Sequence, residues 1–94
     1  MEDQNIPIEV SGEVAGGKYS NIAMIAHNEN EFIVDFIFVH PPKGTLNARV
    51  IMSPSHAKRF LKALGENVAM YEKKVGPIKE TQEPPKFGMD FSKN

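Results

Sequence analysis

Three histidines are the side chains best suited to metal or acid–base chemistry in this chain of 94 residues, which contains no cysteine. Without thiolates there is no cysteine nucleophile and no sulfur-ligated zinc or iron site, so imidazole is the remaining preferred ligand. We expect His27 and His56 at one end of a sheet, close to two glutamates, and His40 at the opposite end. Histidines near turns are common on protein surfaces, and we therefore expect no metal site and no cofactor.

The sequence gives little support for any catalytic motif. The stretch GEVAGGK has glycines and a lysine but lacks the Gly-Lys-Ser/Thr ending of a phosphate-binding loop. Ser20, Ser53 and the histidines lack the spacing of a hydrolase elbow or triad. Asp35 and Arg49 could form a general acid and its modulator, but a cross-strand ion pair explains them more simply. We predict that the chain is not an enzyme. A deep pocket lined by Asp35, Arg49 and His56 would be needed to support an enzymatic function.

A basic cluster of Lys58, Arg59 and Lys62 is the remaining candidate for binding chemistry. Together with Asp35 and Arg49 on the sheet, it makes up the candidate interaction surface. Binding of single-stranded nucleic acid needs such a patch beside exposed aromatic rings on which bases can stack. The phenylalanines are instead expected in the core, at Phe32, Phe36, Phe38 and Phe60. A formal net charge of −1 gives no general attraction to nucleic acid or anionic lipid. Nucleic-acid binding by this helix face is therefore the alternative function, and a solvated face is favoured.

Alternating apolar runs predict the strands that position these residues. The predicted strands are Ile6–Val10, Tyr19–His27, Phe32–His40 and Leu46–Met52. The first is an edge strand because Pro7 cannot donate a ladder hydrogen bond, and a glycine-rich turn follows it. Short connections between the other three favour antiparallel neighbours, which predicts a meander of three to four strands.

Charge complementarity predicts the register of the last two strands. With Phe38 opposite Leu46, one face is wholly apolar, and on the other face Asp35 lies opposite Arg49. The register of the first hairpin stays open, because a two-residue and a three-residue loop within NEN place opposite faces of residues 19–27 on the core.

One long helix from Pro54 to Val75 follows the sheet. Ser53 is a good N-cap, Pro54 suits the first helical position, and Gly76 with Pro77 ends the helix. A stripe of apolar residues recurs at spacings of three and four, and its centre is the predicted oligomer seam: Leu61, Leu64, Val68 and Tyr71. The helix would span about 33 Å, against a width of about 19 Å for four strands. A second subunit is the simplest cover for the overhang, and we expect a homodimer.

Composition and the terminal segments indicate the class of protein, its location and its domain boundaries. A composition of 40% apolar and 24% charged residues is typical of a globular domain, and no apolar run is long enough to span a membrane. The N-terminus MEDQNIP does not have the pattern of a secretion signal, so we expect a cytoplasmic protein with no membrane partner. We predict a single α+β domain over residues 1–77 and a disordered tail over residues 78–94. Its segment FGMDF could be a docking motif, fold back on the body, or have no role.

Residues 19–76 resemble a family of small bacterial domains of unknown function, through a YSN strand, an EF..DF strand, a proline-rich turn and a helix of the pattern R.I.(S/T)P.HAK..L.AL..N...YE...G. The resemblance implies no activity. It draws attention to the polar positions Ser20, Asn21, Asp35, Arg49, His56, Lys58, Asn67, Tyr71 and Glu72. In the order of its elements alone the chain is also similar to whirly-type single-strand DNA-binding proteins and to the export chaperone of the Sec pathway, which assigns no function. We therefore expect a non-enzymatic, oligomeric interaction or scaffold module with an unidentified protein partner.

Overall fold

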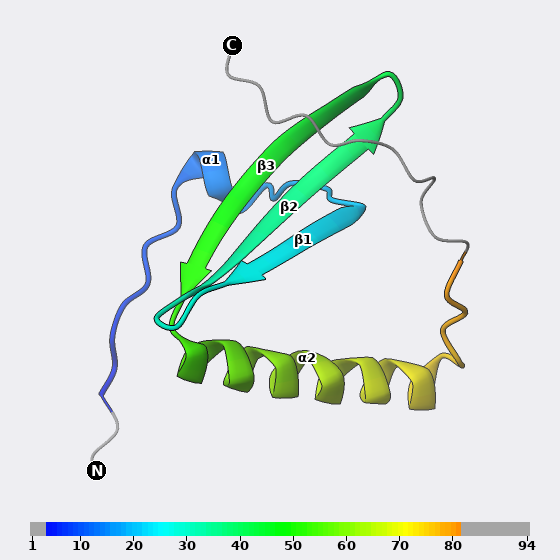
Figure 1. Cartoon of the computed structure of the whole chain (residues 1–94). Coiled ribbons are helices and arrows are strands. Elements are labelled where there is room, and N and C mark those ends of the chain that lie inside the picture. The colour runs from blue at the N-terminus through cyan, green and yellow to red at the C-terminus, as the bar shows by residue number, and fades with distance from the viewer. Residues whose placement is uncertain (1–3, 82–94) are drawn as a thin grey trace. The chain divides into compact units, whose positions relative to one another are not determined.

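The computed structural model describes residues 4–81 and contains five elements in the order helix, three strands, helix (Figure 1). These are α1 (Gly12–Ala15), β1 (Ile22–His27), β2 (Phe32–His40), β3 (Lys43–Met52) and α2 (Pro54–Lys74). The predicted α+β class, with an antiparallel meander followed by one long helix, is confirmed. Backbone contacts divide the chain into two compact units, Met1–Phe60 and Leu61–Asn94, with the division inside α2.

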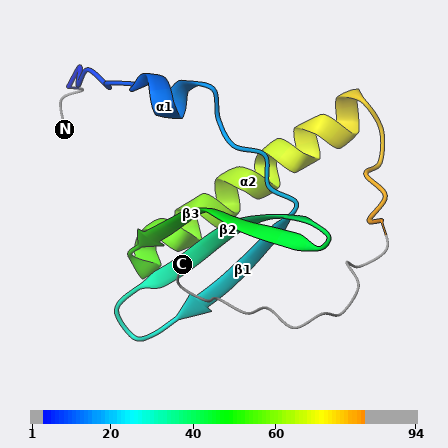
Figure 2. The ribbon, with the colours of Figure 1, turned by 90° about the horizontal axis from the view of Figure 1, so that it is seen from above.

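The sheet has the strand order β1-β2-β3, so β2 is central and both of its neighbours are edges (Figures 1 and 2). In the first hairpin His27 lies opposite Phe32, and the Asn28 N–H donates to the Glu31 carbonyl oxygen at 3.0 Å. The chain therefore turns at Glu29 and Asn30, the two residues between Asn28 and Glu31. This loop length determines the register of the first hairpin, which the sequence left open. The Asn28 side-chain oxygen stabilises this turn by accepting hydrogen bonds from the backbone N–H groups of Asn30 and Glu31 at 2.8 and 2.9 Å.

The second hairpin confirms part of the predicted register. Asp35 lies opposite Arg49, and the pairs between Phe32 and Phe36 are those expected. Beyond Phe36 the prediction is wrong, because an irregularity in the ladder places Leu46 opposite Ile37 instead of opposite Phe38. A shift of one residue moves a side chain to the other face of a sheet, so Leu46 joins the face that carries the ion pair.

Asn47 is the extra residue at this bulge. Its side-chain amide donates a 2.7 Å hydrogen bond to the carbonyl oxygen of Tyr19, which lies before β1. Beyond the bulge β3 extends back to Lys43, three residues earlier than predicted, and the peptide bond between Pro41 and Pro42 in the connecting turn is cis.

The N-terminal segment differs from the prediction. Residues Ile6–Val10 form no strand, and the short helix α1 stands where a glycine-rich turn was expected. An alternating apolar run becomes a strand only when its backbone pairs with a neighbouring edge. The described sheet contains only the three strands of the meander, and Ile6, Ile8 and Val10 are exposed.

Helix α2 ends one residue before the predicted end. Ser53 acts as its N-cap, because its side-chain oxygen accepts a hydrogen bond from the His56 N–H at 3.1 Å. At the other end Lys73 and Lys74 complement the helix dipole, and Gly76 has a φ of 138°, a backbone conformation that favours glycine. In the described part of the chain, no helix is long and apolar enough to cross a membrane.

Within residues 4–81, the buried apolar side chains lie on the central strand. Val34 and Ile37, which point to opposite faces of β2, are 6% and 3% exposed. The expectation of a phenylalanine core is wrong: Phe32, Phe36 and Phe38 are half-buried, and Phe60 is 41% exposed. Side chains on a three-stranded sheet are flanked on both sides only along the middle strand, and no residue of α2 is buried.

Candidate interaction surfaces

The YSN motif is engaged in holding the sheet together. The Ser20 hydroxyl donates to the carbonyl oxygens of Ile22 and Ile37, at 3.0 and 3.1 Å. The Asn21 side-chain amide donates to the Val39 carbonyl oxygen at 3.0 Å, and its oxygen accepts from the Val39 N–H at 2.9 Å. The amide thus imitates a peptide group and extends the β1–β2 ladder beyond Ile22, the first residue of β1. These two residues have a structural role.

Asp35 and Arg49 form the ion pair predicted from the sequence. Arg49 donates from Nε to Oδ1 at 2.7 Å and from Nη2 to Oδ2 at 2.9 Å. The hydrogen bonds from Arg49 lower the pKa of the Asp35 carboxyl, against the opposing effect of desolvation. The same hydrogen bonds raise the pKa of Arg49. A carboxylate held ionised in this way is a poor proton donor near neutral pH, which argues against a general-acid role.

The histidines have separate surroundings. The His27 ring stacks on Phe32 with a centroid distance of 5.3 Å, and the His40 ring lies 6.4 Å from the ring of Phe38. His56 contributes its backbone N–H to the N-cap of α2. Among residues 4–81, no group of three or more histidine, aspartate or glutamate side chains is placed to hold a metal ion.

The basic cluster of Lys58, Arg59 and Lys62 lies exposed in the first half of α2. Arg59 donates from Nη1 to the Ser55 hydroxyl at 2.7 Å. Phe60 is the aromatic residue within this stretch, and it is two positions from both lysines. At about 100° per residue it therefore lies on the opposite side of the helix from them. The cluster and the ring do not form one stacking surface.

The predicted seam is exposed along its whole length. Leu61, Leu64, Val68 and Tyr71 have exposed fractions between 39% and 70%. Their spacings of three, four and three residues place them in one stripe along α2. The seam is thus a continuous apolar strip on the part of α2 that belongs to the second unit.

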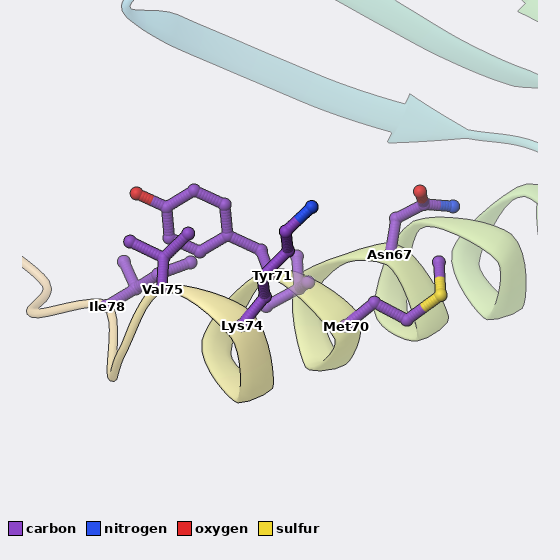
Figure 3. Close-up of a pocket in the computed structure, with 7 residues that line it drawn as sticks. Asn67, Met70, Tyr71, Lys74, Val75 and Ile78 are labelled. Atoms are coloured by element: carbon purple, nitrogen blue, oxygen red, sulfur yellow. The ribbon is translucent and has the colours of Figure 1, made fainter.

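An open, mostly apolar hollow lies beside the C-terminal half of the seam (Figure 3). Its lining is Asn67, Val68, Met70, Tyr71, Lys74, Val75 and Ile78. Figure 3 shows Tyr71 beside Val75 and Ile78, while Met70 projects to another side of the helix. The Ile78 N–H donates to Glu72 Oε2 at 2.9 Å, and Asn67 Nδ2 donates to the Ala63 carbonyl oxygen at 3.1 Å. Two more polar residues of the family pattern therefore make bonds within the chain.

Sequence reasoning brought Asp35 and Arg49 together correctly but missed the roles of Asn21 and Asn47. Asparagine beside or within an apolar run was the available signal, since it is unfavourable in strands and prone to bond to backbone groups. The FGMDF segment, Phe87–Phe91, lies outside the described residues.

Comparison with known proteins gives one family. No curated protein and no solved structure matches the chain. The model of a family described as "Protein of unknown function (DUF3467)" matches residues 1–80. This range includes all three strands and both helices. The chain therefore belongs to this family of proteins of unknown function.

Proposed function

We propose that this chain is a non-enzymatic interaction module that acts as a homodimer, with the seam as the contact between its subunits. The observation that carries the proposal is the exposure of Leu61, Leu64, Val68 and Tyr71 in one strip. Scattered apolar residues are normal on a protein surface, whereas a continuous apolar strip is typical of a contact with another molecule.

The free energy available from burying the seam suits an assembly of modest affinity. About half of each seam side chain remains to be buried, which corresponds to about 1 kcal/mol per residue. Four residues from each of two subunits then contribute about 8 kcal/mol. This gain is comparable with the cost of association, about 4 to 15 kcal/mol. We therefore expect further apolar residues, such as Val75, to contribute, and the equilibrium to be measurable at micromolar concentrations.

The chemistry of the polar residues supports a non-enzymatic role. Among the polar residues of the family pattern, five with side chains that could serve catalysis or ligand recognition are Ser20, Asn21, Asp35, Arg49 and Asn67. Each of them makes hydrogen bonds within the chain, most of them to backbone groups. Such bonds fix the strands and the helix, whereas the apolar seam remains available to a partner.

A pair of matched variants tests this function. Leu64→Lys places a charge at the centre of the seam, where desolvation would be costly. Met70→Lys introduces the same side chain at another exposed apolar position of α2, 61% exposed and outside the seam. Light scattering coupled to gel filtration should give monomers for Leu64→Lys and dimers for Met70→Lys, with equal helix content by circular dichroism. Equal masses for both variants would contradict a seam-mediated dimer.

Nucleic-acid binding is the second candidate, favoured by the exposed cluster of Lys58, Arg59 and Lys62. A filter-binding titration with single-stranded DNA tests it, because affinity based on phosphate contacts falls steeply with salt. Salt-sensitive binding that is lost in Lys58→Ala/Lys62→Ala would support this function. Absence of binding at low salt would eliminate it.

A further inference from the structure

We infer that α2 pairs with α2 of a second copy in antiparallel orientation, about a two-fold axis level with Glu66. The inference rests on the proposed dimer and specifies its geometry. Helix α2 is continuous from Pro54 to Lys74, so the positions along it follow helical spacing. In such a pair, seam residues equally distant from position 66 on the two helices lie opposite each other, whereas residues on like flanks face each other slightly above or below that level.

The apolar layers fit this orientation. Leu61 meets the partner's Tyr71, and Leu64 meets the partner's Val68. Ala57, one step outside the seam, meets the partner's Val75. Each layer then combines a larger with a smaller side chain, which fills space more evenly than two copies of the larger one. In a parallel pair every residue would meet its own copy, so two tyrosine rings would share one layer while two alanines would leave a gap in another.

The charges flanking the seam also favour the antiparallel pair. Lys58, Gly65 and Glu72 recur every seven residues and form one flank. Like flanks face each other in an antiparallel pair, so Lys58 lies opposite the partner's Glu72, and the two-fold axis creates this contact twice. Glu72 Oε2 accepts from the Ile78 N–H, and the second carboxylate oxygen can accept from the lysine. In a parallel pair the flank meets Phe60 and Asn67, which gives no ion pair.

Gly65 is explained by the same geometry. A glycine in a helix interior is less stable than alanine, and a Cβ added at Gly65 would meet nothing within 4 Å. The chain alone therefore gives no steric reason for this glycine. In the antiparallel pair Gly65 lies opposite the partner's Gly65 beside the two-fold axis, where two missing side chains let the helices approach closely. On the other flank, the stem of Lys74 can cover the partner's exposed Phe60.

Cysteine cross-linking tests the orientation cleanly, because the chain has no cysteine of its own. Leu61→Cys and Tyr71→Cys are made as separate chains, one with an additional affinity tag so that products differ in mass, and are mixed under oxidising conditions. We expect the mixed 61–71 disulfide and neither homodisulfide. Homodisulfides at both positions would overturn the inference in favour of a parallel pair. Dimers by sedimentation without any cross-link would also overturn it but leave the proposed dimer standing, whereas a monomer would refute both.

Charge reversal provides a second, independent test. Lys58→Glu or Glu72→Lys alone turns two attractive contacts into two repulsive ones and should raise the dimer dissociation constant about tenfold. The double variant restores opposite charges and should recover most of the loss. Lys62→Glu and Glu66→Lys make the same changes on the outer face of α2 and serve as controls that should leave the constant unchanged. If the double variant has a dissociation constant as high as that of the single variant that dimerises less well, the inference is overturned.

Discussion

Replacing Asn21 with alanine tests whether the YSN motif holds the fold or recognises a ligand. The substitution removes two hydrogen bonds to Val39, of 3.0 and 2.9 Å. An intramolecular hydrogen bond contributes about 0.5 to 1.5 kcal/mol net, and because these two are exposed, water can replace part of the loss. We therefore expect a loss of about 1 to 2 kcal/mol in the free energy of unfolding. For a domain of this size the melting temperature would fall by about 5 to 10 °C.

The assay is thermal unfolding followed by circular dichroism at one fixed protein concentration, because the melting temperature of a dimer depends on concentration. Asn30→Ala is the matched control: Asn30 lies in the exposed first turn, and its backbone N–H, not its side chain, makes the hydrogen bond there. It should change stability by less than about 0.5 kcal/mol. An Asn21→Ala chain that melts with the wild type would refute the structural role, and the motif would then be a candidate ligand contact.

Two further predictions concern the core and the ion pair. Ile37→Ala should lower the free energy of unfolding by about 2 to 4 kcal/mol, because Ile37 is only 3% exposed; urea titration measures this, and an unchanged midpoint would contradict a core centred on β2. The pKa of Asp35 is lower in the folded chain than its ordinary value, so the unfolded chain takes up the proton first as the pH falls. The contribution of the ion pair is therefore complete above about pH 4 and is lost as the pH falls further, through the folded-state pKa. Urea titrations at a series of falling pH values should show the free energy of unfolding decreasing in the wild type and decreasing less steeply in Asp35→Asn. Parallel decreases in the two chains would contradict a contribution from the ion pair.

The elements predicted best are those specified by neighbouring residues. Ser53, Pro54 and Gly76 set the limits of α2 through local capping chemistry, and the helix ends within one residue of its predicted end. The register around Asp35 and Arg49 was also accessible, because two opposite charges in otherwise apolar strands have one arrangement that pairs them. Both signals depend on spacing along the chain and require no knowledge of distant contacts.

The features that escaped prediction depend on distant partners. The bulge at Asn47 accompanies a hydrogen bond to Tyr19, 28 residues away, and no local pattern specifies that bond. The alternation in Ile6–Val10 is a sound strand pattern, but a strand also needs an available edge. The phenylalanines were assigned to a core because they lie on apolar faces of the predicted strands and helix, whereas burial depends on what covers those faces. In the candidate surface, the sequence located the stripe of the seam but could not show how exposed it is.

Sedimentation equilibrium of the unmodified chain across micromolar concentrations tests the central claim most directly, because the proposed function requires the seam to be shared between two copies. We predict a mass that rises with concentration towards twice the chain mass of 10.5 kDa. A folded species of 10.5 kDa at every concentration would contradict the homodimer.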